Sequence, residues 1–220
     1  IIGLLMFFVI GLPIVWATEA LTEFLEGLQG SGKFLFGSIV GGMAAFDFGG
    51  PVNKVASLFA DGLLLEGVQG PEAVKVLASM VPPFGVTISW VLSKIVRKRK
   101  YSKEEEDNIK IAFPMGLCMI TEGVIPIAAV DPLRVIFSCT VGAAIGGGLS
   151  MSWGVGSPVP SGGVFIIPAM TDPLKFTLAL LIGSAITGIL LFVLKKEPVE
   201  NEIKDDEEEE EVDFSSIKIS

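Results

Sequence analysis

The stretch LKFTLALLIGSAITGILLFVL, residues 174–194, decides the fold class of this chain. It is the cleanest apolar run in the sequence, and two lysines, Lys195 and Lys196, close it. A helix needs roughly 20 consecutive apolar residues to cross the hydrocarbon core of a membrane. The stretch therefore predicts a transmembrane helix, and it places the chain among integral membrane proteins rather than soluble domains.

The composition of the whole chain agrees with this class. Half of the 220 residues are hydrophobic, 19% are charged, and the mean hydropathy is +0.66. The net charge of −9 comes from residues 197–220, which hold 11 acidic and 2 basic side chains. The consecutive acids at 205–211 repel one another and cannot form a core. We expect a membrane domain over residues 1–196, then a disordered, acidic cytoplasmic tail or linker over 197–220, and no nucleic-acid partner.

Four further segments are expected to form helices in or on the membrane. Residues 1–17 carry no charge and predict a helix whose start lies upstream, so we expect the chain to be a fragment of a longer protein. Residues 18–29 place glutamates near helical spacing, which suits an interfacial helix. Residues 72–96 and 133–151 are each long enough to span the membrane.

Other apolar segments are interrupted by glycine and proline beside charged residues. Residues 34–50 and 52–65 look like one crossing that breaks at 46–54. Residues 111–130, with Glu122 near the middle, suggest a re-entrant hairpin, because irregular backbone at membrane depth must be buried by protein or line a wet cavity. The expected fold class is an all-α integral membrane protein with multiple transmembrane helices, re-entrant hairpins and broken helices.

The basic residues set the expected orientation. Residues 97–100 form the densest basic cluster, and the polar loop is expected to continue through 103–110. Because cytoplasmic loops of membrane proteins are enriched in lysine and arginine, residues 97–100 and the lysine pair 195–196 are both expected in the cytoplasm. An even number of crossings must then separate them, which holds if 111–130 dips into the membrane and returns.

The sequence offers little for metal, redox or acid–base chemistry. The chain has no histidine, and Cys118 and Cys139 belong to no CxxC pair and lie in apolar stretches. A buried free thiol acts as a small hydrophobe, and histidine is the commonest general base and metal ligand. We therefore expect no catalytic residue, no metal site and no cofactor in this chain.

The first motif is GGMAAFDFGGPVNK at residues 41–54. Asp47, Asn53 and Lys54 lie at the expected helix break, and the glycines allow close approach of neighbouring backbones. Ionisable residues within membrane segments are functional candidates by default, so Asp47 and Lys54, with Asn53 beside them, are predicted to bind substrate. The alternative is an Asp47–Lys54 ion pair that only satisfies itself between helices.

The second motif is ITEGVIP at residues 120–126. A carboxylate can accept two hydroxyl hydrogen bonds at once, which suits a sugar, so Glu122 and its neighbour Thr121 are predicted to bind substrate. The alternative is a glutamate that faces water on a loop. Nearby, Asp131 is expected to cap the helix that follows it and to pair with Arg134.

The third motif is GVGSPVPSGG at residues 154–163, inside an irregular loop expected over 152–168. Its prolines favour extended backbone and its glycines permit positive φ. Ser157, Ser161 and Gly162 offer hydroxyl and backbone groups, and they are predicted substrate contacts. The alternative is a plain extramembrane loop.

Taken in order, the three motifs resemble the fructose-type enzyme IIC permease of the bacterial phosphotransferase system, over roughly residues 30–195. The residues that carry the resemblance are FDFGGPVNK at 46–54, TEG at 121–123 with AVDPLR at 129–134, and GSPVPSGG at 156–163. The family loop usually reads Pro-His-Gly-Gly, whereas this chain has Ser161 at the histidine position. Family members are also longer, with first spans that precede the part matched here.

The resemblance implies a sugar permease of the bacterial cell membrane, with fructose as the expected sugar. Such a permease takes sugar from outside, a cytoplasmic IIB domain phosphorylates it from a cysteine, and sugar-phosphate is released inside. Glu122 matches the position of a glutamate that binds a sugar hydroxyl in the wider superfamily. The resemblance also implies a homodimer and a partner IIB domain as phosphoryl donor. Two alternatives stay open at this point: an ion-coupled secondary sugar transporter, and an inactive truncated remnant of the permease.

Overall fold

The computed structural model describes residues 31–197, so the helices expected at 1–17 and 18–29 and nearly all of the acidic tail lie outside the described residues. In chain order the elements are α3 (Ser31–Phe46), α4 (Pro51–Leu65), α5 (Gly70–Ile95), α6 (Lys103–Leu117), η2 (Glu122–Val124), α7 (Ile125–Val130), α8 (Pro132–Ser152), η3 (Gly163–Ala169) and α9 (Pro173–Leu194). The described residues contain no strand, and the all-α class is confirmed.

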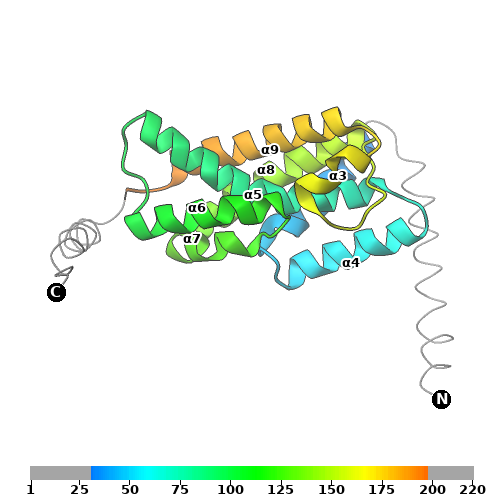
Figure 1. Ribbon diagram of the computed structural model, residues 1–220, viewed down its shortest axis with the longest axis horizontal. Coiled ribbons are helices and arrows are strands. Elements are labelled where there is room, and N and C mark those ends of the chain that lie inside the picture. The colour runs from blue at the N-terminus through cyan, green and yellow to red at the C-terminus, as the bar shows by residue number, and fades with distance from the viewer. Residues whose placement is uncertain (1–30, 198–220) are drawn as a thin grey trace, which may run out of the picture.

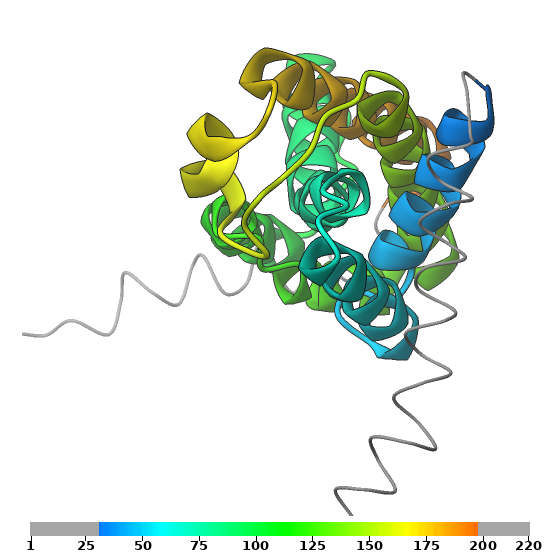
Figure 2. The ribbon, with the colours of Figure 1, turned by 90° about the vertical axis from the view of Figure 1, so that its right-hand side faces the viewer.

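Three of these helices are long and apolar enough to cross a membrane: α5, α8 and α9. They confirm that long apolar helices form at the predicted segments 72–96, 133–151 and 174–194. The three helices run along the long axis of the molecule (Figure 1). Viewed end-on, α5 lies near the middle of the bundle, where it packs on α3, α8 and α9 (Figure 2). The chain is therefore an integral membrane protein.

Glycine lets these helices pack at short range. A side chain on Gly142 of α8 would overlap Thr187 of α9 and the carbonyl oxygen of Gly183. A side chain on Gly147 of α8 would overlap the carbonyl oxygen of Gly37 in α3. In lipid, small residues at helix interfaces allow the close van der Waals packing that holds a bundle together. The helix α3 is thereby fixed against α8.

The helices α3 and α4 form a hairpin, so the prediction that 34–50 and 52–65 make one interrupted crossing is wrong. The ring centroids of Phe36 and Phe59 lie 6.0 Å apart, which brings the start of α3 beside the end of α4. The chain reverses at Gly49, whose φ is +100°. A broken crossing and a tight reversal need the same glycine–proline interruption, so the sequence pattern alone did not separate them.

The segment predicted at 111–130 to be a re-entrant hairpin does reverse its direction. α6 leads into it, and η2 and α7 pack back against α6. The polar loop expected over 103–110 is wrong, because α6 already begins at Lys103. The hydroxyl of Ser102 accepts a hydrogen bond from the Glu105 backbone at 3.2 Å, and the Glu105 carboxylate accepts one from the Ser102 backbone at 3.0 Å. This capping box satisfies free N–H groups at the helix start.

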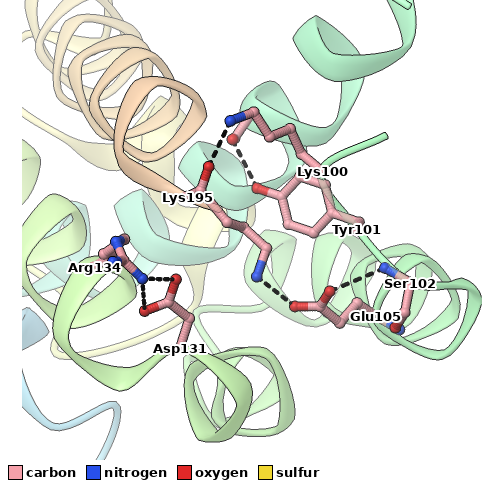
Figure 3. A network of polar contacts seen from close by, with 8 residues as sticks. Lys100, Tyr101, Ser102, Glu105, Asp131, Arg134 and Lys195 are labelled. Carbon is pink, nitrogen blue, oxygen red and sulfur yellow. Dashed lines mark hydrogen bonds and ion pairs between the residues drawn. The ribbon is translucent and has the colours of Figure 1, made fainter. Parts of the chain in front are cut away.

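A network of polar contacts joins the start of α6 to the end of α9 (Figure 3). Lys195 Nζ lies 2.7 Å from Glu105 Oε1, and the two side chains are 4% and 5% exposed. Lys100 Nζ donates to the carbonyl oxygen of Lys195 at 2.6 Å. The Lys195 ammonium also lies 5.1 Å from the ring centroid of Tyr101, whose pKa is raised by burial. The basic cluster 97–100 and Lys195 therefore lie at the same end of the molecule, as an even number of crossings requires.

The predicted pair of Asp131 and Arg134 is confirmed, but the predicted cap is not. Arg134 Nη1 donates to both carboxylate oxygens of Asp131, at 2.9 and 3.0 Å. Asp131 occupies the N-cap position of α8 without a side-chain capping hydrogen bond. The arginine has taken up the oxygens that would otherwise have capped the helix.

Candidate functional site

The tips of the two hairpins meet at Gly49 and Glu122. A Cβ atom on Gly49 would lie 2.5 Å from Oε1 of Glu122, so the glutamate lies directly against the backbone of the α3–α4 turn. Gly49 adopts its positive φ without the steric cost that a side chain would bring. The α3–α4 hairpin comes from one end of the molecule and the α6–α7 hairpin from the other, so this contact lies between the two ends (Figure 1).

Glu122 is exposed at this meeting point. Among the residues that the structure describes, no hydrogen bond or ion pair engages its carboxylate. An ionised carboxylate only accepts hydrogen bonds, and its two oxygens can take several donors at once. The arrangement therefore offers a free acceptor to a ligand that carries hydroxyl or amine groups.

The carboxylate of Asp47 holds the α3–α4 turn. It accepts hydrogen bonds from the backbone N–H groups of Val52 at 2.7 Å and Asn53 at 2.9 Å, which are free donors at the start of α4. Asn53 is buried, and its side-chain amide donates to the carbonyl oxygen of Ala44. Lys54 is exposed, and within residues 31–197 it forms no ion pair with Asp47. The alternative of an Asp47–Lys54 pair is therefore wrong.

Two contacts fix the tip that carries Glu122. The buried hydroxyl of Thr121 donates to the carbonyl oxygen of Ser79 in α5 at 3.3 Å. Gly163 has φ +57° and lies so close to the carbonyl oxygen of Leu117 that any side chain there would overlap it. The end of the third motif thus lies on the turn that leads from α6 to Glu122.

The structure separates the three residues predicted from the third motif. Gly162, with φ +139°, and the exposed Ser161 directly precede Gly163, so they lie near the tip. Ser157 is buried and held by its own surroundings. Its hydroxyl donates to the carbonyl oxygen of Val159 at 2.8 Å, and its backbone N–H donates to the carbonyl oxygen of Gln69 at 3.0 Å. Ser157 therefore ties the third motif to the connection that precedes α5.

A cleft of about 340 Å³ opens near Ser157, at the end of the bundle away from the basic cluster 97–100. Its walls include Lys33, Met151 and Thr171, and the connection from α4 to α5 at 67–70. The cleft is separate from the Gly49–Glu122 contact. No group of histidine, cysteine or carboxylate side chains suited to a metal ion occurs in the described part of the chain.

Gly49 and Gly163 were not predicted as site residues, and the expectation that Cys118 is a buried apolar thiol is wrong, because it is exposed. The Gly-Gly-Pro sequence at 49–51 is a turn signal that could have identified the reversal. Cys118 ends α6 and is exposed, and its position at the tip follows only from the hairpin.

Comparison with known proteins identifies curated relatives over most of the chain. It is 44% identical over 191 residues to the PTS system fructose-specific EIIC component of Haloferax volcanii, which covers 86% of this chain and 50% of that protein. It is 41% identical over 200 residues to the PTS system fructose-specific EIIB'BC component of Xanthomonas campestris, covering 89% and 34%. It is 38% identical over 200 residues to the fructose permease IIC component of Bacillus amyloliquefaciens, covering 91% and 64%.

The chain spans half the length of the Haloferax relative and about a third of the Xanthomonas one. No protein-family model matches the chain. No solved structure matches it either.

Proposed function

We propose a function from the premise that this chain belongs to the family of fructose-specific EIIC components, the membrane components of sugar phosphotransferase systems. The chain binds a sugar, with fructose as the first candidate, and carries it across the bacterial cell membrane for phosphorylation by a cytoplasmic IIB domain. The observation that carries this proposal is the free carboxylate of Glu122 at the contact of the two hairpin tips.

Sugar hydroxyl groups are the ligand chemistry that fits this carboxylate. Each hydroxyl donates one hydrogen bond, and bonds to an ionised acceptor are stronger than bonds between neutral groups. The other residues that we expect to border the sugar, or to hold the two tips around it, are Asp47, Asn53, Lys54, Thr121, Ser161 and Gly162. Ser157 contributes indirectly in this proposal, by holding the third motif to the connection that precedes α5.

The phosphoryl group comes from a IIB domain in this proposal. Relatives from Xanthomonas campestris and Bacillus subtilis are named EIIB'BC and EIIABC components, and these names favour a B component working with the C component. The basic cluster 97–100 then faces the cytoplasm, as lysine- and arginine-rich loops do, together with the acidic tail 197–220. The chain crosses the lipid bilayer several times and forms a homodimer.

Cys118 provides a direct test of sugar binding at the tips. It is exposed, whereas Cys139 is buried in α8 and serves as an internal control. Saturating fructose is expected to slow the reaction of Cys118 with a water-soluble maleimide by about tenfold or more, because a site occupied by sugar is no longer open to the reagent. The rate is measured by mass spectrometry on the full-length protein in membranes.

Two comparisons make this labelling result specific. The variant Glu122→Gln should lose the protection at the same fructose concentration, since its affinity for the sugar is lower. Sucrose at equal osmolarity should give no protection. Equal labelling rates with fructose and with sucrose in the unmodified protein would speak against sugar binding beside Cys118.

A further inference from the structure

Each of the two hairpins is held near its base by a buried lysine. Lys75, in the first turns of α5, pairs with Asp61 of α4. Lys195, at the end of α9, pairs with Glu105 of α6. The start of α5, which carries Lys75, and the end of α9, which precedes Lys195, lie at opposite ends of the molecule (Figure 1). The meeting tips between them carry Gly49 and Glu122.

Lys75 has two carboxylates within reach. Its Nζ lies 2.6 Å from Asp61 Oδ1 and 2.8 Å from Glu72 Oε1. The contact with Asp61 has hydrogen-bond geometry, whereas neither carboxylate oxygen of Glu72 has a hydrogen-bond partner among the described residues. Glu72 is fully buried and Lys75 is 3% exposed, while Asp61 is 42% exposed. Glu72 is thus a second ion-pair partner of Lys75, on the same helix as the lysine.

The pair at the other end is fully occupied. Glu105 uses Oε1 for Lys195 and Oε2 for the backbone N–H of Ser102. The carbonyl oxygen of Lys195 is taken up by Lys100 (Figure 3). In the described part of the chain, the structure places no second carboxylate against the Lys195 ammonium.

The two hairpins therefore differ in the free-energy cost of breaking the ion pair that holds each of them. Removing one partner of a buried ion pair is costly because it leaves a buried charge without compensation. Lys75 avoids that cost when Asp61 departs, because Glu72 stays beside it on α5. Lys195 has no such substitute, so the α6–α7 hairpin stays attached.

The packing of α4 also indicates that this helix is held weakly. Of its side chains only Asn53, Ala56, Ala60 and Leu63 are buried, which form a single stripe. α4 packs on α3 and α5, whereas α3 is also packed closely against α8 through glycines. Elements with few buried contacts lie at the low-stability end of a structure. The glycines at 49–50 and Gly67, with open space around it, bound α4 at its two ends, and the cleft at 67–70 lies beside the second of them.

We propose that α4 is a gate whose turn at Gly49 lies against Glu122, and that it opens toward the cleft end when Lys75 releases Asp61 and keeps Glu72 as its partner. Opening moves the turn at Gly49 away from Glu122. That the gate admits a sugar rests on the proposed function, whereas the movement of α4 does not. Asp61 therefore holds the gate closed. Glu72 lowers the free-energy cost of opening, because the Lys75 ammonium stays paired when Asp61 leaves.

Thiol labelling of α4 tests the gate without any sugar. Ala56 is 2% exposed on the inner stripe of α4, so Ala56→Cys reports opening to a water-soluble maleimide. The full-length protein carries Cys118→Ser and Cys139→Ala to remove the native thiols. We expect Asp61→Asn to raise the labelling rate about tenfold, and Glu72→Gln to lower it by a similar factor, since each substitution removes one charged partner of the buried Lys75.

Two controls separate gating from general loosening. Glu66→Gln removes an exposed carboxylate at the end of α4 and should leave the labelling rate unchanged. A thiol at Ala112, fully buried on α6, should keep its rate in all variants. Opposite shifts for Asp61→Asn and Glu72→Gln support the gate. Shifts in the same direction, no shift in either variant, or a parallel change at Ala112→Cys would overturn it. Because the assay contains no sugar, a failed gate and a failed transport function give different results.

Discussion

Replacing Glu122 by glutamine is expected to weaken fructose binding by roughly 10- to 150-fold, equivalent to about 1.5–3 kcal/mol for hydrogen bonds to a charged group. The variant keeps the size of the side chain and removes its charge. The Glu122 carboxylate has no hydrogen-bond or ion-pair partner among the described residues. The substitution therefore breaks no contact within the protein, and the expected loss of affinity comes from the missing hydrogen bonds to the sugar. Equilibrium binding of radiolabelled fructose to the full-length protein in membranes measures the effect.

A matched substitution controls for charge. Glu104 is exposed in the first turn of α6, so Glu104→Gln makes the same chemical change on the same hairpin, far from the tip. Its fructose affinity should equal that of the unmodified protein. If Glu122→Gln binds fructose as well as Glu104→Gln does, the sugar does not depend on this carboxylate and the assignment of the site fails.

Replacing Gly49 by alanine is expected to lower fructose affinity by about tenfold or more, an effect of the size expected for one lost hydrogen bond to a charged group. A Cβ atom at this position would lie 2.5 Å from Oε1 and 2.9 Å from Cδ of Glu122, so the glutamate must move. The substitution therefore tests whether the contact between the two tips positions the carboxylate.

Gly67 supplies the control for backbone strain. It has φ +87°, close to the +100° of Gly49, but a Cβ atom there meets nothing within 4 Å. Both alanine variants should therefore lose roughly 1–2 kcal/mol of stability from the left-handed conformation. Only Gly49→Ala should also lose fructose affinity. Equal affinity in the two variants, measured by the same binding assay beside a thermal unfolding scan, would mean that Gly49 serves the turn alone.

The sequence predicted the long helices well because their signal is local. Residues 72–96, 133–151 and 174–194 are apolar over the length of a membrane crossing, and each became a helix with ends within a few residues of the prediction. The capping box at Ser102 and Glu105 is equally local, and reading it would have corrected the polar loop expected over 103–110.

The pairing of elements could not be read from local pattern. Whether α4 continues the direction of α3 or reverses depends on backbone dihedrals at Gly49, which the glycine permits in either sense. Glu105 and Lys195 are 90 positions apart, so no spacing rule connects them. Glu72 and Lys75 do have a helical i, i+3 spacing, but this spacing is typical of exposed pairs on a helix surface. Only the structure shows that both are buried.

The candidate site, like the fold, was predicted from the sequence only in part. Glu122 was predicted from its chemistry within an interrupted apolar segment, whereas its contact with Gly49 of the first motif is seen only in the structure. Asp47 and Thr121 turned out to hold the tips through hydrogen bonds to Val52 and Ser79. Those contacts depend on how the hairpins fold against each other and α5, which the residue types alone do not specify.

Uptake of radiolabelled fructose by cells tests whether this chain works as the membrane part of a group-translocating sugar permease. Cells that express the full-length gene are given the sugar, and the label inside is separated by charge. We expect labelled sugar-phosphate inside the cells, and we expect it to disappear when the phosphoryl donor is removed. Free fructose that accumulates with a proton or sodium gradient, independently of that donor, would contradict this expectation.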